Sequence, residues 1–164
     1  MSKILVTGNA GSGKSSVAKK LARTLNHPLY GMDSIVWKEN WKKTTSADRS
    51  KQVAAIIEQE SWVIDGVDDE VMKAADIVIF LDVPRRVSYW RVLKRNKNYL
   101  FKSRPGLPAK CPEILIIPTL VKIIWRFPSR VRPKILAEKA SREGTSFVHV
   151  RKWADLERYL RLFE

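Results

Sequence analysis

Residues 8–15 read Gly8-Asn9-Ala10-Gly11-Ser12-Gly13-Lys14-Ser15 and satisfy the pattern G-x-x-x-x-G-K-[ST]. They lie between a short apolar run, Ile4-Leu5-Val6, and a segment with apolar residues at helical spacing. Strand, glycine-rich turn and helix is the context in which this pattern binds phosphate. Small residues let backbone N–H groups close around a phosphate, and the helix N-terminus adds its dipole. The stretch therefore predicts a nucleotide site after the first strand.

The chemistry expected of this loop is divided among its residues. Lys14 is expected to reach the β- and γ-phosphates of ATP, and Ser15 to supply an oxygen to Mg²⁺. The other residues predicted to bind the nucleotide here are Gly8, Asn9, Ala10, Gly11, Ser12, Gly13 and Ser16. ATP and Mg²⁺ are thus the expected cofactors. The alternative is a glycine-rich turn that holds no ligand.

The rest of the chain alternates between strand and helix patterns. Further strands are predicted at about 29–32, 62–66, 77–81 and 146–150. Thr45-x-x-Asp48 has the form of a capping box before a helix expected to end near Glu60. Pro84 suits position N1 of a basic helix running to about Asn98. Buried strands alternating with helices favour an α/β fold with a parallel sheet covered on both faces, in three layers.

The segment from Arg104 to Pro133 differs in composition from the rest of the chain, because it holds six of the eight prolines. Prolines at this density predict broken helices rather than one continuous element. We expect a mobile, lid-like insertion at about residues 96–133 within a single domain of residues 1–164.

Composition narrows the expected environment and partners. The 31 Lys and Arg outnumber the 17 Asp and Glu, so the formal net charge is +14. Such a surface attracts nucleotides, nucleic acid or anionic lipid. Cys111 is the only cysteine and no export signal is evident, so we expect a cytoplasmic protein. The most apolar stretch, 114–127, is too short and too charged to span a bilayer, although a role at a membrane surface stays open.

Beyond the loop, the sequence resembles the nucleoside monophosphate kinase-like P-loop kinases, which include adenylate kinase and shikimate kinase. Ile64-Asp65-Gly66 is similar to the strand-end Asp-Gly of adenylate kinases, and Leu81-Asp82-Val83-Pro84 to the strand before their lid-bearing helix. The resemblance implies a P-loop NTPase fold with a five-stranded parallel sheet of order 2-3-1-4-5 and a helical lid. It also implies that Asp65 holds Mg²⁺ through its water shell, whereas the alternative is a turn-capping Asp.

The resemblance also suggests further site residues. Arg91 and Arg95 match the arginine pair of the family and lie one helical turn apart, so they could clamp phosphate charge; alternatively they form a solvated basic face. Asp33 follows the second strand, where these kinases place a substrate-binding or base-like acid. Arg151 follows the last strand, where the family packs a loop against adenine. Lys14, Arg91, Arg95 and Asp33 are the expected catalytic residues.

Some of the other residues are expected to have structural roles, and for the two tryptophans Trp37 and Trp41 two roles are possible. Asp82 is expected to cap the helix that begins at Pro84, and the two histidines lack partners at metal-binding spacing. Trp37 and Trp41 could wall an acceptor pocket or belong to the core.

A closer similarity is to the bacterial DNA topology modulation proteins, FlaR-like, which are usually described as adenylate kinase-related. It rests on Trp62-Val63-Ile64-Asp65-Gly66, Leu81-Asp82-Val83-Pro84-Arg85, Arg104-Pro105, Cys111-Pro112-Glu113, Phe127-Pro128, Arg132-Pro133-Lys134 and Trp37. Their residue after Asp-Gly is usually Asn, whereas this chain has Val67. Because Val67 stands where these proteins usually have Asn, the resemblance does not extend to the acceptor site.

Two functions follow as hypotheses. The first is an ATP-dependent kinase that moves the γ-phosphoryl group to a nucleotide or small-molecule acceptor. The alternative is a nucleic-acid-associated ATPase or nucleotide-gated DNA-binding protein affecting DNA topology, with aromatics such as Trp90 and Phe101 stacking on bases. Because the positive charge is concentrated around residues 85–132, as a kinase lid requires, the first is favoured. The sequence leaves the oligomeric state open.

Replacing Lys14 tests the predicted loop directly. Lys14→Ala should abolish nucleotide binding or turnover without unfolding the domain, since this side chain is expected to face phosphates rather than the core. Calorimetric titration with ATP, together with circular dichroism as a folding control, measures both. Unchanged ATP affinity and activity in the variant would contradict the proposed role of the loop.

Overall fold

The computed structural model describes residues 2–97, 99–101, 103, 107–141 and 146–161. The strands are β1 Lys3–Gly8, β2 Leu29–Gly31, β3 Trp37–Lys38, β4 Lys42–Lys43, β5 Trp62–Asp65, β6 Ile77–Leu81 and β7 Ser146–Val150. The helices are α1 Lys14–Leu25, α2 Met32–Val36, α3 Ser46–Ile57, α4 Asp69–Ala74, α5 Arg85–Asn96, α6 Ile117–Arg130, α7 Arg132–Ser141 and α8 Trp153–Leu160. Single 3₁₀ turns cover Glu39–Trp41 and Glu113–Leu115.

The central sheet has five parallel strands in the order β2-β5-β1-β6-β7. Counted along the chain, the strands of this sheet follow the order 2-3-1-4-5, which confirms the prediction. The labels differ only because β3 and β4 form a separate antiparallel hairpin. All five strands end at the same edge, so the acids that follow them are brought to one side of the molecule.

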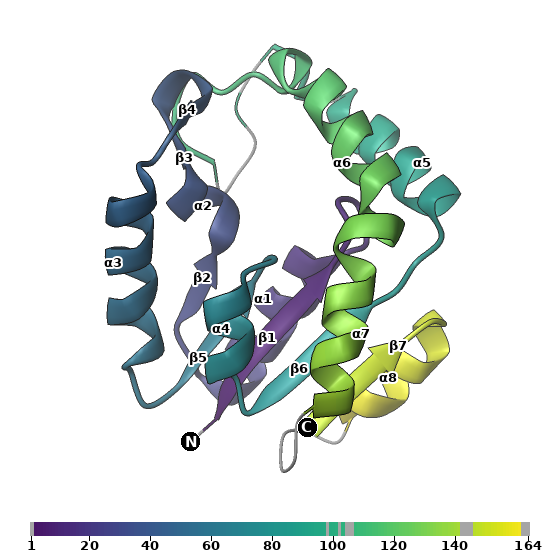
Figure 1. The fold of residues 1–164 in the computed structure, drawn as a ribbon. Coiled ribbons are helices and arrows are strands. Elements are labelled where there is room, and N and C mark those ends of the chain that lie inside the picture. The colour runs from purple at the N-terminus through teal and green to yellow at the C-terminus, as the bar shows by residue number, and fades with distance from the viewer. Residues whose placement is uncertain (1, 98, 102, 104–106, 142–145, 162–164) are drawn as a thin grey trace.

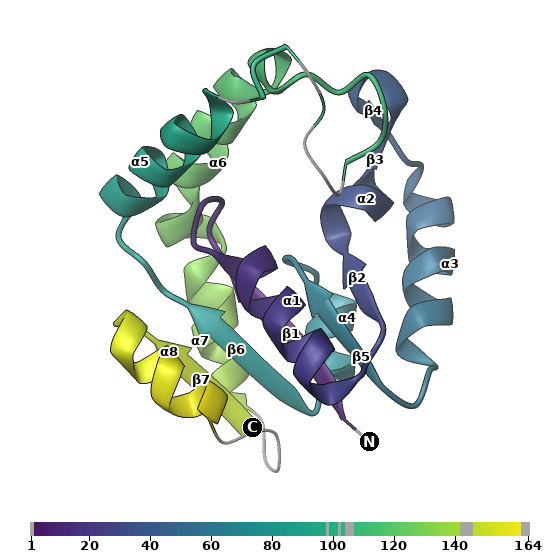
Figure 2. The same cartoon turned by 180° about the vertical axis from the view of Figure 1, so that it is seen from behind.

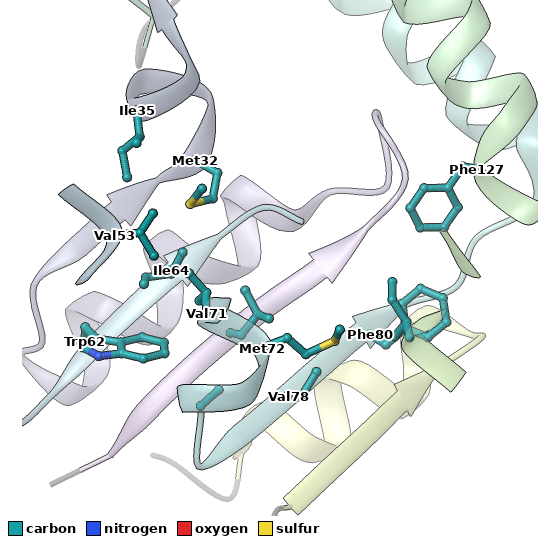
Figure 3. Close-up of a cluster of buried hydrophobic side chains, with 13 residues drawn as sticks. Met32, Ile35, Val53, Trp62, Ile64, Val71, Met72, Val78, Phe80 and Phe127 are labelled. Carbon is teal, nitrogen blue, oxygen red and sulfur yellow. The ribbon is translucent and has the colours of Figure 1, made fainter. Parts of the chain in front are cut away.

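Two apolar clusters, one on each face, hold the three layers together. Along β1, Ile4 and Val6 pack with α1 and α8, whereas Leu5 between them packs with α4 and α7. This alternation follows from the period of two in a strand. Figures 1 and 2 show the two pairs of helices on opposite faces, and Figure 3 shows the cluster around Trp62 and Phe80. The predicted three-layer α/β fold is confirmed.

The expectation of broken helices in the proline-rich segment is wrong for residues 117–130, which form one helix, α6. Pro118 lies in its first turn, where the missing N–H is not needed. Pro128 lies near its end and leaves the carbonyl group of Ile124 without its usual helical donor. That carbonyl instead accepts a hydrogen bond from the Asn9 side chain, at 3.2 Å. Residues 104–106 and 142–145 lie outside the described residues.

Several predicted boundaries also differ from the structure. Met32 opens helix α2 rather than ending a strand, because Met32 and Ile35 are both buried one turn apart and Ser34 Oγ donates to the carbonyl group of Gly31. Asp33 therefore lies in the first helical turn instead of at a strand end. Pro84 is the N-cap of α5, not position N1. The helix predicted to end near Glu60 ends at Ile57.

The capping box predicted before α3 is confirmed. Thr45 is the N-cap of α3, and its Oγ1 accepts a hydrogen bond from the Asp48 backbone N–H at 3.2 Å. Trp37 and Trp41 are not one helical turn apart, but they contact each other edge to face across the β3–β4 hairpin, with ring centroids 5.4 Å apart. Both rings are half-buried. None of the helices in the described ranges has the length and apolarity needed to cross a membrane.

Candidate nucleotide and acceptor site

The glycine-rich loop has a shape that requires glycine at its centre. Gly11 and Gly13 adopt φ angles of 74° and 99°, in the left-handed region. A Cβ atom on Gly11 would lie 2.6 Å from the carbonyl oxygen of Ser88 and 2.9 Å from a methyl group of Val92. Both contacts belong to α5, so the loop and this helix approach as closely as a glycine allows.

The same loop leaves polar groups directed at a ligand site. Helix α1 begins at Lys14 with Gly13 as its cap, and no side chain caps its first-turn N–H groups. Ser12 Oγ is buried and has no hydrogen-bond partner among the described residues. Lys14 Nζ donates to the carbonyl oxygen of Asn9 at 2.8 Å, across the loop. N–H groups at a helix N-terminus beside a lysine form an anion site, so these residues fit the phosphates of ATP.

The two predicted arginines lie in different surroundings. Arg91 Nη1 donates to the carbonyl oxygen of Ser12 at 3.0 Å, which places this guanidinium group on the loop. Arg95 instead lies beside Glu113, with 3.7 Å between Nη2 and Oε2, and Glu113 is 1% exposed. The structure thus brings Arg91 to the predicted nucleotide site and pairs Arg95 with a buried acid.

The two predicted metal ligands, Asp65 and Ser15, lie at the end of β5 and in the first turn of α1. Asp65 ends β5 and pairs in register with Val6 of β1, so it stands beside the strand that leads into the loop. Ser15 is exposed in the first turn of α1, as is Ser16. The described residues contain no cluster of three or more His, Cys, Asp or Glu side chains. The hydroxyl of Ser15 and the carboxylate of Asp65 are oxygen donors of the kind that Mg²⁺ takes in proteins beside phosphate and water.

Two other predicted site residues lie on exposed surface. Asp33 is exposed on α2, and Arg151 is exposed directly after β7, the strand at one edge of the sheet.

Asp82 makes a cluster that the sequence did not predict. Its Oδ2 accepts from Arg132 Nη2 at 2.9 Å and lies 2.8 Å from His149 Nε2, and its Oδ1 lies 3.0 Å from Arg132 Nε. The ring of His149 stacks on Phe80 at 5.2 Å between centroids. Asp82 therefore joins β6 to β7 and α7 instead of capping α5.

These contacts change the pKa of both charged partners. Burial raises the pKa of Asp82, but the hydrogen bonds from Arg132 and His149 outweigh it, so the pKa lies below its ordinary value of 3.8. The hydrogen bond to Asp82 raises the pKa of Arg132. The cluster is thus an ion pair over a wide pH range.

A pocket of about 510 Å³ lies next to the loop. Its lining residues are Thr7, Arg49, Val67, Asp68, Asp69, Met72, Arg130, Val131, Lys134 and Ile135. Thr7 is the residue before Gly8, so the pocket and the loop share the end of β1. The volume falls within the range of small-molecule sites.

Most polar residues of this pocket were missed by sequence reasoning. Arg130 and Lys134 come from the junction of α6 and α7, far along the chain from Thr7, and only folding brings them together. One local signal was available, the acidic residues after Val67. Asp68 caps α4 by accepting from the N–H groups of Glu70 and Val71 at 3.0 and 3.1 Å, and it also pairs with Arg49.

The fold and loop define the class of protein, a P-loop protein with the fold of small-molecule kinases. A profile of the family described as an AAA domain matches residues 4–100, more than half of the chain. The chain therefore belongs to the AAA domain family. A search of curated protein sequences finds no match.

Several solved structures similar to this chain are described as kinases of different acceptors. Shikimate kinase from Acinetobacter baumannii, in complex with shikimate, is 16% identical, with 99% of this chain and 90% of that chain covered and a TM-score of 0.54. Deoxyadenosine kinase from M. mycoides with bound dATP is 18% identical, with 98% and 96% covered and a TM-score of 0.51. A gluconokinase from Sinorhizobium meliloti is 20% identical, with 99% and 90% covered and a TM-score of 0.53. At this identity the likeness establishes the fold.

Asp82→Asn tests the structural role of the Asp82 cluster. At pH 7 the variant should lose about 1.5–3 kcal/mol of unfolding free energy, the usual contribution of hydrogen bonds to a charged group. Because the pKa of Asp82 is lower in the folded state, its contribution is present above about pH 4 and is lost as the pH falls through the folded pKa. Urea unfolding at pH 7 and pH 3 should show the difference from wild type shrinking in acid. An equal loss in the exposed control Glu58→Gln, or a difference independent of pH, would contradict this role.

Proposed function

We propose that the protein is an ATP-dependent kinase that phosphorylates a small-molecule acceptor bound in the pocket beside Thr7. The carrying observation is that the loop and the pocket share the end of β1. A γ-phosphate held at Lys14 would therefore lie near an acceptor in the pocket. Kinase catalysis of this kind depends mainly on positioning and charge stabilisation.

Specific residues are assigned to each part of this reaction. The backbone N–H groups of Gly11 and of residues 13–15 would hold the phosphates, since the Ser12 N–H donates to the Asn9 carbonyl group at 3.1 Å. Lys14 and Arg91 would stabilise charge on the transferred group. Ser15 and Asp65 are the proposed residues for Mg²⁺, which when bound would neutralise charge on the phosphates. Arg95, which lies beside Glu113, remains a proposed catalytic residue that would add positive charge to the same site. Arg151 remains a proposed contact to adenine.

The proton of the attacking hydroxyl needs an acceptor on the protein. Asp33 was predicted for this role, but it does not line the pocket. Asp69 does line it and is exposed in the first turn of α4. Asp69 is therefore the stronger candidate for the general base, and Asp33 remains a second one.

The lid and the closer family likeness are also proposals. The lid-like insertion predicted at about residues 96–133 stays a proposal, and its closure would keep water from competing as acceptor. The resemblance to adenylate kinase-like and FlaR-like proteins supports a nucleotide-binding kinase, and its location in the cytoplasm is proposed from the single cysteine and the lack of an evident export signal. A nucleic-acid-coupled ATPase is the alternative, to which the basic segment 85–132 would contribute.

Release of ADP from Mg²⁺-ATP tests this function. The purified protein would be incubated with each of a panel of nucleoside monophosphates, nucleosides, small metabolites and DNA, beside a control without acceptor. One small acceptor should stimulate ADP release, with a phosphorylated product seen by mass spectrometry. Stimulation by DNA alone, without such a product, would contradict the kinase assignment and support the alternative.

A further inference from the structure

Two of the basic side chains that line the pocket beside the loop are in no ion pair among the described residues. Among its three basic side chains, Arg49 is paired with Asp68. Arg130 and Lys134 make no ion pair or side-chain hydrogen bond within the described part of the chain, and both are exposed. Both side chains line the same pocket, so an anion bound there would be stabilised by both charges.

These cations are held in place by buried anchors. Arg130 ends α6 and Lys134 lies in the first turns of α7, with Val131 between the helices. Phe127 and Ile135, which flank them, are 5% and 1% exposed and belong to one core cluster. The backbone that carries both cations is therefore fixed against the sheet, as a preorganised binding site requires.

The rest of the pocket limits the kind of molecule. Its apolar lining residues are Val67, Met72, Val131 and Ile135. They suit a compact carbon skeleton, and about 510 Å³ holds one small molecule. Asp69 adds a carboxylate to the same lining, where it would accept a hydrogen bond from a hydroxyl group and disfavour an anion at its own position.

We propose that the acceptor is a small hydroxyl compound with one anionic group, a carboxylate or a phosphate, held by Arg130 and Lys134. This inference rests on the proposed function and names the substrate class for the same pocket. Neutral sugars and nucleosides leave both cations without a partner, so they should be poor acceptors. Recognition of the anion by Arg130 would be the stronger of the two, since a guanidinium group can donate two parallel hydrogen bonds.

A direct binding experiment tests the anion site without requiring catalysis. Inorganic phosphate would be titrated into the protein saturated with Mg²⁺-ADP, so that the glycine-rich loop is already occupied. Binding would be followed by NMR of the arginine and lysine side chains. The wild type should bind phosphate saturably, whereas Arg130→Gln and Lys134→Gln should bind it about tenfold more weakly or worse.

Matched variants control for loss of general positive charge. Arg126→Gln and Lys122→Gln remove exposed cations from α6 that do not line the pocket, and they should bind phosphate as the wild type does. Equal weakening in all four variants would mean nonspecific charge attraction and would overturn the proposal. So would the absence of saturable phosphate binding in the wild type. Circular dichroism of each variant confirms that the domain is folded.

Paired acceptors separate this proposal from the proposed function. ADP release would be compared between gluconate and glucose, between shikimate and its methyl ester, and between dAMP and deoxyadenosine. Preference for the charged member of a pair, lost in Arg130→Gln, supports the anion site. Activity on neutral members that Arg130→Gln leaves unchanged overturns the anion site and leaves the kinase intact. Phosphate binding at Arg130 without any phosphoryl transfer supports the site and contradicts the kinase.

Discussion

The contact between the glycine-rich loop and two helices from the second half of the domain determines how the site is built. Gly11 approaches the carbonyl oxygen of Ser88 on α5 so closely that no other residue fits. Asn9 donates to the carbonyl of Ile124 on α6, the group that Pro128 leaves without a helical partner. Since α6 continues into α7, these contacts also position the cations beside the pocket.

The charges of the site divide into paired and unpaired groups, and the division follows their roles. Arg132 with Asp82 and Arg49 with Asp68 join elements of the fold. Ion pairs of this kind keep their geometry because each partner is hydrogen-bonded and partly buried. The cations of the α6–α7 junction that line the pocket make no ion pair among the residues that the structure describes, so they are available to a ligand. Of the positive charges that give this chain a net charge of +14, some are therefore proposed to bind substrate, whereas others join elements of the fold.

The fold was largely predictable because its determinants are local. Ile77–Leu81 is an apolar run that only a buried strand explains, and residues 8–15 carry their own turn and helix signals. Continuous α6 was missed, because the carbonyl freed by Pro128 finds its partner 115 residues away, in Asn9. The pocket was missed for the same reason, since its walls come from segments that only the folded sheet brings together. Asp33 was expected at the end of the second strand, but α2 begins at Met32, so Asp33 lies in the first turn of that helix.

If the close packing of the loop against α5 shapes a phosphate site, Gly11→Ala should bind Mg²⁺-ADP more weakly than the wild type. Gly31→Ala is the matched control, because a Cβ atom there would meet nothing nearer than 3.8 Å. Calorimetry should show strongly weakened ADP binding in Gly11→Ala and little change in Gly31→Ala, with both proteins folded. Unchanged ADP affinity in a folded Gly11→Ala protein would contradict the account.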